Sequence, residues 1–360
     1  MNIKKTCLSL IAIILLFSCA ENNGIVNEVT LKGQIVNITS NEGKIPVFLI
    51  DDYVYSRDSA HNVWVGKLSK NEWQKSEMVF AFGHGHNEFG IIAPSKGEDG
   101  TLYILNHPMV GGNFVSLTKI PHANNITSMK DQTKWETHNL INLPAFSQAG
   151  QASIILPDST ILVTGAPSND LKHIFSIINY KKLTVTPLDY WPDDGNPDKL
   201  QKDKFLIYSG YGHIEKNGNG KFLYWNEVGK HAFIFSIEGT KISIQNKLYA
   251  DRLHLPSVDG HPSCEQISCC SDKDRIYVLY KEYDRKGEKL KKIPVTDPFV
   301  LGNTIEVYDW DGVKQQVIHL DKLGDYILLS EDGNTLYLFP SDWDATPFPL
   351  FYSYNLRTIE

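Results

Sequence analysis

One two-strand phrase recurs six times along the chain, at a spacing of roughly 50 to 60 residues. Each copy starts with a turn rich in Asp, Asn, Gly or Lys, which leads into a short apolar or aromatic strand. These turn-plus-strand segments are Asp51–Tyr55, Asp99–Leu105, Asp158–Val163, Gly220–Trp225, Lys273–Leu279 and Asp332–Leu338. A second apolar strand follows each, at His61–Leu68, Asn113–Ile120, His173–Tyr180, His231–Glu238, Asn303–Trp310 and Phe351–Leu356. Short strands that recur at a fixed period are typical of radial or stacked repeat architectures.

Each repeat also has a candidate inner strand just before its turn. The candidates span residues 47–50, 90–93, 151–156, 212–216, 265–270 and 325–330. Removing an 18-residue signal segment would leave 342 of the 360 residues, about 57 per repeat, which suits four short strands and their turns. No stretch of about 12 residues or more combines a helical period with a cap, so negligible helix is expected beyond the signal segment. The sequence therefore predicts an all-β fold: a six-bladed β-propeller with four-stranded antiparallel blades.

The two ends of the repeat array predict how the ring closes. The sixth repeat ends after three recognisable strands, whereas Val29–Val36 is a strand-like segment with no repeat of its own. Pairing this segment with the strand near Phe351–Leu356 would complete the last sheet and cover its exposed edge. We therefore expect a ring closed by an N-terminal strand.

The first twenty residues have the pattern of a secretory signal. Lys4 and Lys5 precede an apolar run of about ten residues, which is too short to cross a hydrocarbon core of ~30 Å. The segment Leu16–Cys19 resembles a bacterial lipobox, in which Cys19 would be the lipidation site; an ordinary cleaved signal peptide is the alternative. The expected organisation is a signal peptide over 1–18, a tether over 19–28 and one propeller domain over 29–360. This predicts a membrane-anchored lipoprotein of the cell envelope, in the outer membrane, with periplasmic and surface-facing orientations both open.

Charge argues against some partners. The formal net charge is −7, and the basic run Arg285–Lys292 lies in a long insertion between two strands, where a solvated loop is the expected role. Nucleic acid is therefore not an expected partner.

Three cysteines remain beside Cys19 in the mature chain: Cys264, Cys269 and Cys270. In an extended strand Cys264 and Cys270 lie about 20 Å apart, too far for a disulfide. Cys269 and Cys270 point to opposite faces. Buried free thiols are therefore expected.

Two segments resemble known propeller families. Gly83–Phe89 followed by Asp99–Ile104 resembles the start of an NHL-type blade, and Thr304–Gly312 resembles a strand and turn of the TolB-like six-bladed propellers. This resemblance implies a six-bladed fold and a cell-envelope setting. It carries over no catalytic residues.

Three predicted inner-strand starts share a Gly-His step followed by a carboxylate. The candidate ligand-binding residues are His84, His86 and Glu88, then His213 and Glu215, then His261 and Glu265. The starts of inner strands meet at one mouth of a propeller channel, where imidazoles and carboxylates could orient a polar ligand or bind a divalent metal. The alternative is structural: the glycines allow the turns and the histidines cap or stack. No catalytic motif is present, so no catalytic residue is predicted.

Two loops place an aromatic residue beside carboxylates. They are Tyr190–Asn196 and Asp342–Asp344, and either could bind a sugar ring or a protein. The alternative is that Trp191 and Trp343 fold back over blade edges.

The sequence therefore predicts a non-enzymatic envelope lipoprotein whose propeller binds a protein, peptide or glycan. The alternative is a metal-dependent hydrolase or lactonase with its site at the channel mouth. No cofactor is expected for the first function, and a divalent metal would accompany the second.

Overall fold

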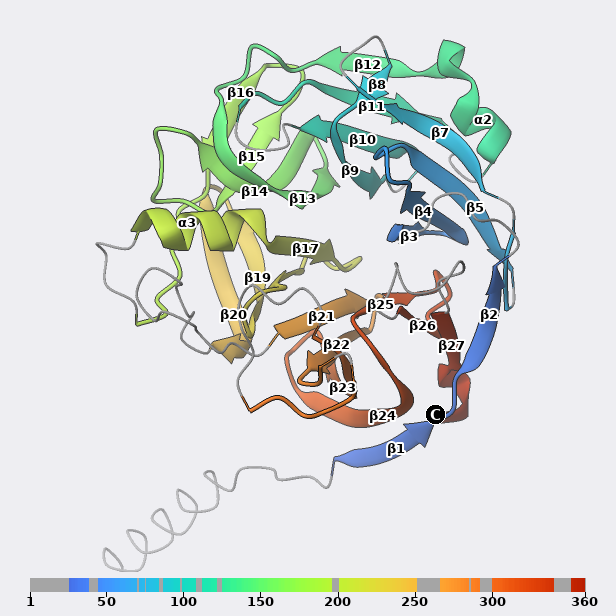
Figure 1. Cartoon of the computed structure of the whole chain (residues 1–360). Coiled ribbons are helices and arrows are strands. Elements are labelled where there is room, and N and C mark those ends of the chain that lie inside the picture. Colours follow the sequence, from blue (N-terminus) through green and yellow to red (C-terminus); the bar gives the residue numbers. More distant parts are fainter. Residues whose placement is uncertain are drawn as a thin grey trace, which may run out of the picture.

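The computed structural model describes residues 26–38, 45–69, 71–74, 76–83, 87–97, 99–107, 112–121, 125–195, 201–250, 266–284, 286–291, 300–339 and 351–359. In this part of the chain, β-sheets are arranged radially around a central axis (Figure 1). The first strand of each repeat lies nearest the centre: β3 (Ile45–Ile50), β9 (Ile91–Lys96), β13 (Phe146–Leu156), β17 (Gly212–Lys216), β21 (Gln266–Ser271) and β25 (Tyr326–Leu329). This arrangement is a β-propeller.

Three sheets are four-stranded and antiparallel throughout, in the order of the chain. The first contains β9, β10 (Leu102–His107), β11 (Ser116–Ile120) and β12 (Glu136–Asn139). The second contains β13, β14 (Thr160–Pro167), β15 (Phe175–Asn179) and β16 (Thr184–Pro187). The third contains β17, β18 (Phe222–Asn226), β19 (His231–Glu238) and β20 (Lys241–Ala250). The predicted strand positions are confirmed in these sheets.

Two larger sheets complete the set. One has the order β1-β24-β23-β22-β21, with β1 (Asn27–Leu31), β22 (Arg275–Lys281), β23 (Gly302–Asp309) and β24 (Lys314–Gly324). The other runs β25-β26-β27-β2-β6-β5-β4-β3, and β7 (Glu77–Phe82) pairs with both β5 and β8 (Glu88–Phe89). Its remaining members are β2 (Gln34–Ile38), β4 (Tyr53–Arg57), β5 (Val63–Ser69), β6 (Glu72–Trp73), β26 (Thr335–Phe339) and β27 (Phe351–Asn355).

The N-terminal segment forms two strands rather than one. β2 pairs antiparallel with β27, with Val36 opposite Phe351, whereas β1 runs parallel to β24. Between the two strands the chain passes close to Tyr354, because a Cβ atom at Gly33 would lie 2.7 Å from the Tyr354 ring. The Gly33 amide also donates a hydrogen bond to Asp321 Oδ1 over 2.8 Å. β1 begins at Asn27, within the stretch predicted as a tether.

The prediction of negligible helix is wrong for one element. Beside the single turns α2 (Ile126–Lys130), η1 (Gln132–Lys134) and η3 (Leu356–Ile359), the described chain forms α3 (Gln201–Gly210), which packs against β13 and β14 (Figure 1). No clean apolar stripe marks α3 in the sequence, because Lys204 and Ser209 are among its buried residues. Among the described residues, no helix has both the length and the apolar character needed to cross a membrane.

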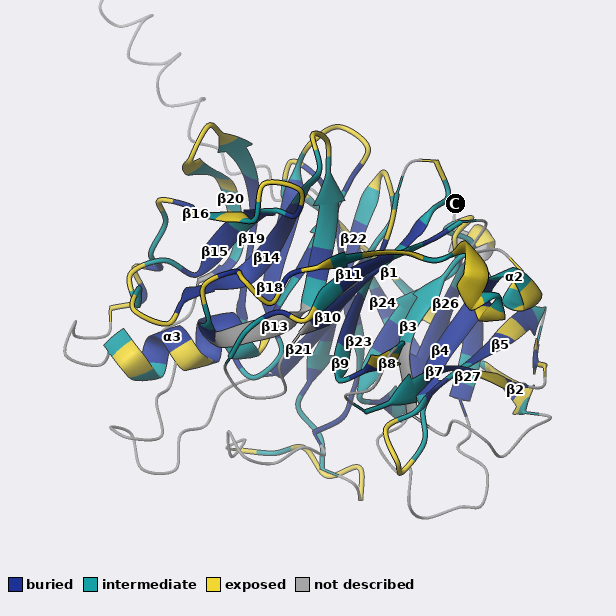
Figure 2. Cartoon of the chain, turned by 90° about the horizontal axis from the view of Figure 1, so that it is seen from above, coloured by how far each residue is buried: buried dark blue, intermediate teal, exposed yellow. Residues whose placement is uncertain are grey.

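Hydrophobic clusters fill the space between neighbouring sheets. Strand β18 is buried along its whole length and serves two of them. Phe222 and Tyr224 pack with Phe175 of β15, whereas Leu223 packs with Ile276 of β22. The predicted two-sided apolar character of the middle strands is therefore confirmed. Figure 2 shows the result: buried residues follow the strands, and exposed residues gather on turns and the outer helices.

Candidate functional site: the central channel

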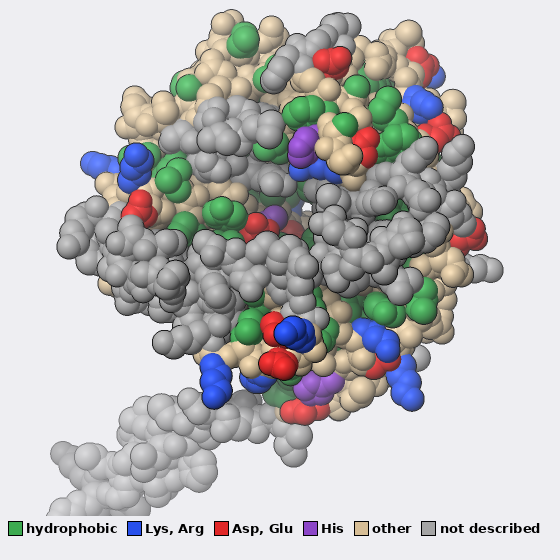
Figure 3. Space-filling view, in the orientation of Figure 1, with side chains coloured by type: hydrophobic (Ala, Val, Ile, Leu, Met, Phe, Trp, Pro, Cys, Tyr) green, Lys and Arg blue, Asp and Glu red, His purple; other side chains and the backbone are tan. Residues whose placement is uncertain are grey.

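A cavity of about 1700 Å³ occupies the centre of the disc. Its wall is formed by residues of β3, β9, β13, β17, β21 and β25, the first strand of each repeat, and the largest sheet contributes two of these strands, β3 and β25. Figure 3 looks onto one face of the disc, and histidine and carboxylate side chains are visible at its centre. A cavity of this size exceeds the roughly 300–1,000 Å³ that is usual for small-molecule pockets.

The channel has two mouths, set by the direction of the inner strands. At the turn mouth lie the hairpin turns that follow the inner strands. There Lys96, the last residue of β9, forms an ion pair with Asp51 of the β3–β4 turn and another, over 2.7 Å, with Glu331 of the β25–β26 turn. At the start mouth lie the residues where inner strands begin and second strands end. We define it by Arg57, His213, Glu227, Lys281 and Asp325, all of which line the cavity.

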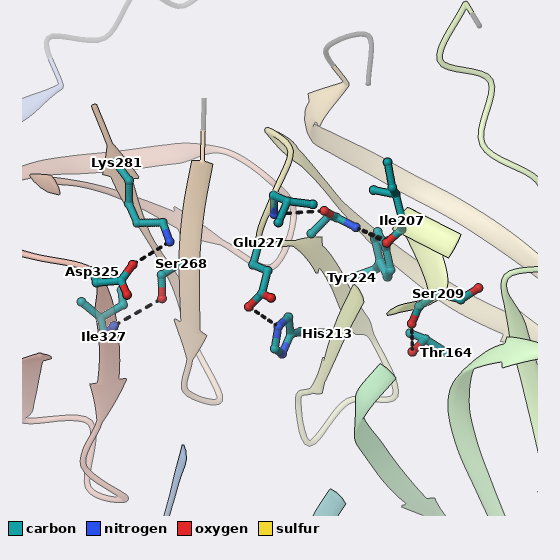
Figure 4. Close-up of polar contacts among 12 residues, drawn as sticks. Thr164, Ile207, Ser209, His213, Tyr224, Glu227, Ser268, Lys281, Asp325 and Ile327 are labelled. Atoms are coloured by element: carbon teal, nitrogen blue, oxygen red, sulfur yellow. Dashed lines mark hydrogen bonds and ion pairs between the residues drawn. The ribbon is translucent and has the colours of Figure 1, made fainter. Parts of the chain in front are cut away.

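His213 and Glu227 form one pair at the start mouth (Figure 4). His213 Nε2 lies 3.2 Å from Glu227 Oε2, and the imidazole stacks on the Trp225 ring with centroids 4.0 Å apart. His213 and Trp225 are directly opposite in the β17–β18 register, which explains the stacking. Burial favours the neutral acid, but the hydrogen bond and charge of His213 and the charge of Lys281 outweigh it and hold the pKa of Glu227 below its usual range.

Lys281 and Asp325 form a second pair beside the first (Figure 4). Lys281 Nζ, at the end of β22, lies 2.8 Å from Asp325 Oδ1, just before β25. Between the same two sheets, Ser268 Oγ accepts a hydrogen bond from the Ile327 amide over 3.3 Å. Glu227, Lys281 and Asp325 therefore place charges of alternating sign from the sheet of β17 to the sheet of β25.

Glu215 lies deeper in the channel, two residues along β17 from His213. Its carboxylate accepts a hydrogen bond from the Ser271 hydroxyl of β21. Burial raises the pKa of Glu215, while the Ser271 hydrogen bond acts in the opposite direction. The two inner strands thus share one carboxyl group inside the channel.

Cys269 and Cys270 are free and buried, as the sequence predicts. They belong to different clusters, since Cys269 packs with Leu223 and Cys270 packs with Leu338, which confirms their opposite orientation. Burial raises the pKa of both thiols well above the usual value. They are therefore poor nucleophiles at neutral pH.

The channel contains only part of the predicted site. His213 and Glu215 line it, whereas Glu88, in the two-residue strand β8, is exposed and is not among the lining residues. Glu88 is held elsewhere because β8 pairs with β7 rather than with an inner strand. The other predicted site residues lie outside the described part of the chain: His84, His86, His261, Glu265 and the lipidation candidate Cys19.

Four functional candidates at the start mouth were not predicted: Arg57, Glu227, Lys281 and Asp325. Three of them share a position, since each ends or directly follows an otherwise apolar second strand. A charged residue at the end of a mainly apolar strand was therefore the signal in the sequence that could have identified these three residues. No sequence signal showed that Lys281 of one repeat pairs with Asp325 of the next.

The aromatic loop near Trp191 is a structural element. Trp191 is partly buried against a cluster that includes Phe175, and Lys204 Nζ lies 5.3 Å from its ring centroid. Asp194 is buried rather than exposed. This agrees with the alternative interpretation of that segment. The other aromatic loop, 342–344, lies outside the described residues.

In the part of the chain that the structure describes, no group of three or more His, Cys, Asp or Glu side chains is placed to hold a metal ion.

No protein-family model matches the chain, and no curated protein matches it. Solved structures do share its fold. A protein described as exported, from Bacteroides fragilis NCTC 9343, superposes with a TM-score of 0.50 at 9% identity, over 91% of this chain and 99% of that chain. A member of the DUF4221 family from Bacteroides vulgatus ATCC 8482 gives a TM-score of 0.51 at 10% identity, over 90% of this chain and 92% of that chain. At these identities the likeness concerns the fold alone.

Proposed function

We propose that this β-propeller is a non-enzymatic binding scaffold whose central channel receives a protein segment, peptide or glycan. The observation that carries the proposal is the chemistry of the channel wall. Its lining offers fixed charges and hydrogen-bonding groups, while Cys269 and Cys270 are buried with raised pKa values. Such a wall can recognise a ligand, but its described part holds no activated nucleophile.

The partner is an extended chain rather than a compact metabolite. The cavity of about 1700 Å³ is lined by the innermost strands of the propeller, and its charged groups are spread over several sheets. Recognition at separated points along a channel suits a peptide or glycan strand, which can contact all of them at once.

The setting we propose is the cell envelope, with Cys19 lipidated in the outer membrane. The lipobox-like segment Leu16–Cys19 supports the anchor, and the exported protein from Bacteroides fragilis has a similar fold. Replacing Cys19 with Ala should move the protein from the membrane fraction to the soluble fraction. Unchanged partitioning would contradict the anchor.

We propose that the ring has six blades closed by β2, in keeping with the NHL-type and TolB-like sequence motifs. Support comes from the largest sheet, in which the two-residue strand β6 is the link between β2 and β5. Dividing the sheet at β6 gives two blades, β3-β4-β5-β7 and β25-β26-β27-β2. The outermost strand of the second blade is then β2, which comes from the N-terminal end of the chain, whereas β25, β26 and β27 come from the C-terminal end.

The binding proposal is tested by capture from solubilised envelopes. Replacing His213 with Ala removes a cavity-lining side chain and should reduce the captured partner at least tenfold, about 1.4 kcal/mol. His319→Ala is the matched control, because His319 lies on the outer strand β24 and pairs with Glu28 of β1. Equal capture by the two variants would show that the partner binds elsewhere.

A metal-dependent hydrolase or lactonase is the second candidate, favoured by one observation. His213 and Glu215 both line the channel, and Glu227 fixes the imidazole as an outer partner fixes a ligating histidine. Elemental analysis of the untagged protein decides between the two, since the second function requires a stoichiometric divalent metal.

A further inference from the structure

We propose that the short segment between Cys19 and β1 holds the disc over the membrane with its turn mouth toward the bilayer, so that the start mouth opens into the aqueous compartment. The inference rests on the proposed function, because it takes Cys19 as the lipidated residue. It goes further in assigning the mouth by which a partner enters the channel. The face of the disc that contains the turn mouth is called the turn face, and the opposite face is called the start face.

The direction of β1 shows on which face the N-terminal segment joins the disc. β1 runs parallel to β24, and its first residue, Asn27, is opposite Gln316, close to where β24 begins. β24 begins just after the β23–β24 turn, and Asp309, the last residue of β23, is opposite Arg275, the first residue of β22. Arg275 follows the turn between β21 and β22, which lies at the turn mouth. The N-terminal segment therefore reaches β1 at the turn face.

β1 packs against its sheet, so this point of entry is fixed. Leu31 is buried in one hydrophobic cluster with Ile318 and Leu320 of β24. Glu28 Oε2 lies 3.4 Å from His319 Nε2 of the same strand. β1 is the outermost strand of its sheet, at the rim of the disc (Figure 1). The N-terminal segment therefore joins the disc at the rim of the turn face.

The chain between Cys19 and Asn27 is too short to reach around the disc. Its eight residue steps span at most about 29 Å, even when fully extended. A path to the start face must follow β24 from Gln316 to Gly324, about 26 Å at 3.3 Å per residue. It must then pass the segment between β22 and β23, which contains the bridges formed by Tyr283. A bilayer on the start-face side would therefore lie beyond reach, whereas a bilayer on the turn-face side requires no detour.

This orientation leaves more room at the start mouth than at the turn mouth. The first residue of β1 is at most about 29 Å from the anchor, roughly the diameter of a small domain. A folded partner would have to fit within that gap to reach the turn mouth. The start mouth is farther from the lipid, since the seven residues of β22 alone span about 23 Å. The His213–Glu227 and Lys281–Asp325 pairs of the start mouth therefore face a partner that approaches from the aqueous side.

Fluorescence energy transfer from the two ends of one strand tests the orientation. Lys273 precedes β22 at the turn face and Lys289 follows β22 at the start face, and their side chains are 83% and 65% exposed. Each is replaced with Cys in a separate variant that also contains Cys264→Ser, and each variant is labelled with the same donor dye. Cys269 and Cys270 are buried and their thiol pKa values are raised, so they should stay unlabelled. The lipidated full chain is then added to phosphatidylcholine vesicles that contain an acceptor dye on the lipid headgroups.

We expect energy transfer from position 273 to be at least twofold more efficient than from position 289, because about 23 Å of strand separates the two ends of β22. Lengthening the tether is the matched control. An insertion of about 12 Gly and Ser residues after Ala20 adds enough flexible chain for the disc to turn over. The difference between the two positions should then shrink.

Equal transfer from the two positions, or stronger transfer from position 289, would overturn the orientation and leave the lipid anchor intact. An undiminished difference with the longer tether would overturn the short tether as its cause. Cys19→Ala separates these failures from a failure of the anchor, because it should abolish transfer from both positions. Transfer that persists in Cys19→Ala would overturn the anchor and the orientation together, whereas capture of a partner that depends on His213 would show that the channel function still stands.

Discussion

Replacing Asp194 with Ala should destabilise the protein by about 3–5 kcal/mol, because it would leave a buried lysine without its counter-charge. Asp194 Oδ1 lies 2.6 Å from Lys204 Nζ of α3, and the two side chains are 0% and 3% exposed. The Tyr208 hydroxyl donates to Asp194 Oδ2 over 3.2 Å, so a second buried donor would lose its acceptor. Urea unfolding of the wild type and the variant measures the difference.

Two further variants make the Asp194 result specific. Asp193→Ala changes the neighbouring exposed carboxylate and should alter the free energy of unfolding by less than about 0.5 kcal/mol. Replacing the pair together, Asp194→Leu with Lys204→Met, should recover most of the loss, because an apolar pair avoids the desolvation of two charges. A loss below about 1 kcal/mol for Asp194→Ala would contradict a pairing role for this buried carboxylate.

Deleting residues 26–38 should have an effect of similar size and should promote aggregation. The deletion removes β1 and β2, which bury Leu31 and Val36. At about 1.5–3 kcal/mol for each buried aliphatic side chain, these two account for roughly 3–6 kcal/mol. It also leaves β27 and β24 with unpaired edges, which invite pairing with other chains. The melting temperature and light scattering on heating measure the two effects.

A matched pair in β2 separates ring closure from general damage. Val36 is 1% exposed and Ile35 is 52% exposed on the same strand. Val36→Asp should therefore reproduce much of the loss, whereas Ile35→Asp should be nearly neutral. If both substitutions, and the deletion itself, leave the melting temperature unchanged, the N-terminal strands do not close the ring.

The strands could be predicted from the sequence because their signal is local. In Phe222–Trp225 and Ile276–Leu279, continuous apolar runs bounded by turn residues mark strands that pack on both faces, and the structure places β18 and β22 there. Helix α3 was missed because its burial depends on Lys204, whose partner Asp194 lies outside the helix. A hydrophobic pattern cannot show a charge that is buried through a distant partner.

The site was only partly predictable, for a related reason. His213 and Glu215 were found because they stand beside a glycine at the start of an inner strand. Lys281 and Asp325 come from different repeats and contact each other only when two sheets are side by side. Glu88, like Glu215, is a carboxylate that follows a Gly-His step, but pairing of β8 with β7 kept it outside the channel.

Photo-cross-linking from inside the channel tests the central claim, that the channel is where the ligand binds. A photoreactive phenylalanine analogue would replace Leu328, which lines the cavity, and in a second variant Val313, which is 56% exposed on a turn and is not a lining residue. Both variants would be irradiated in intact envelopes and analysed by mass spectrometry. The account predicts a discrete adduct from position 328 and none from position 313. An adduct from position 313 alone, or no adduct from position 328 in envelopes that contain the captured partner, would contradict it.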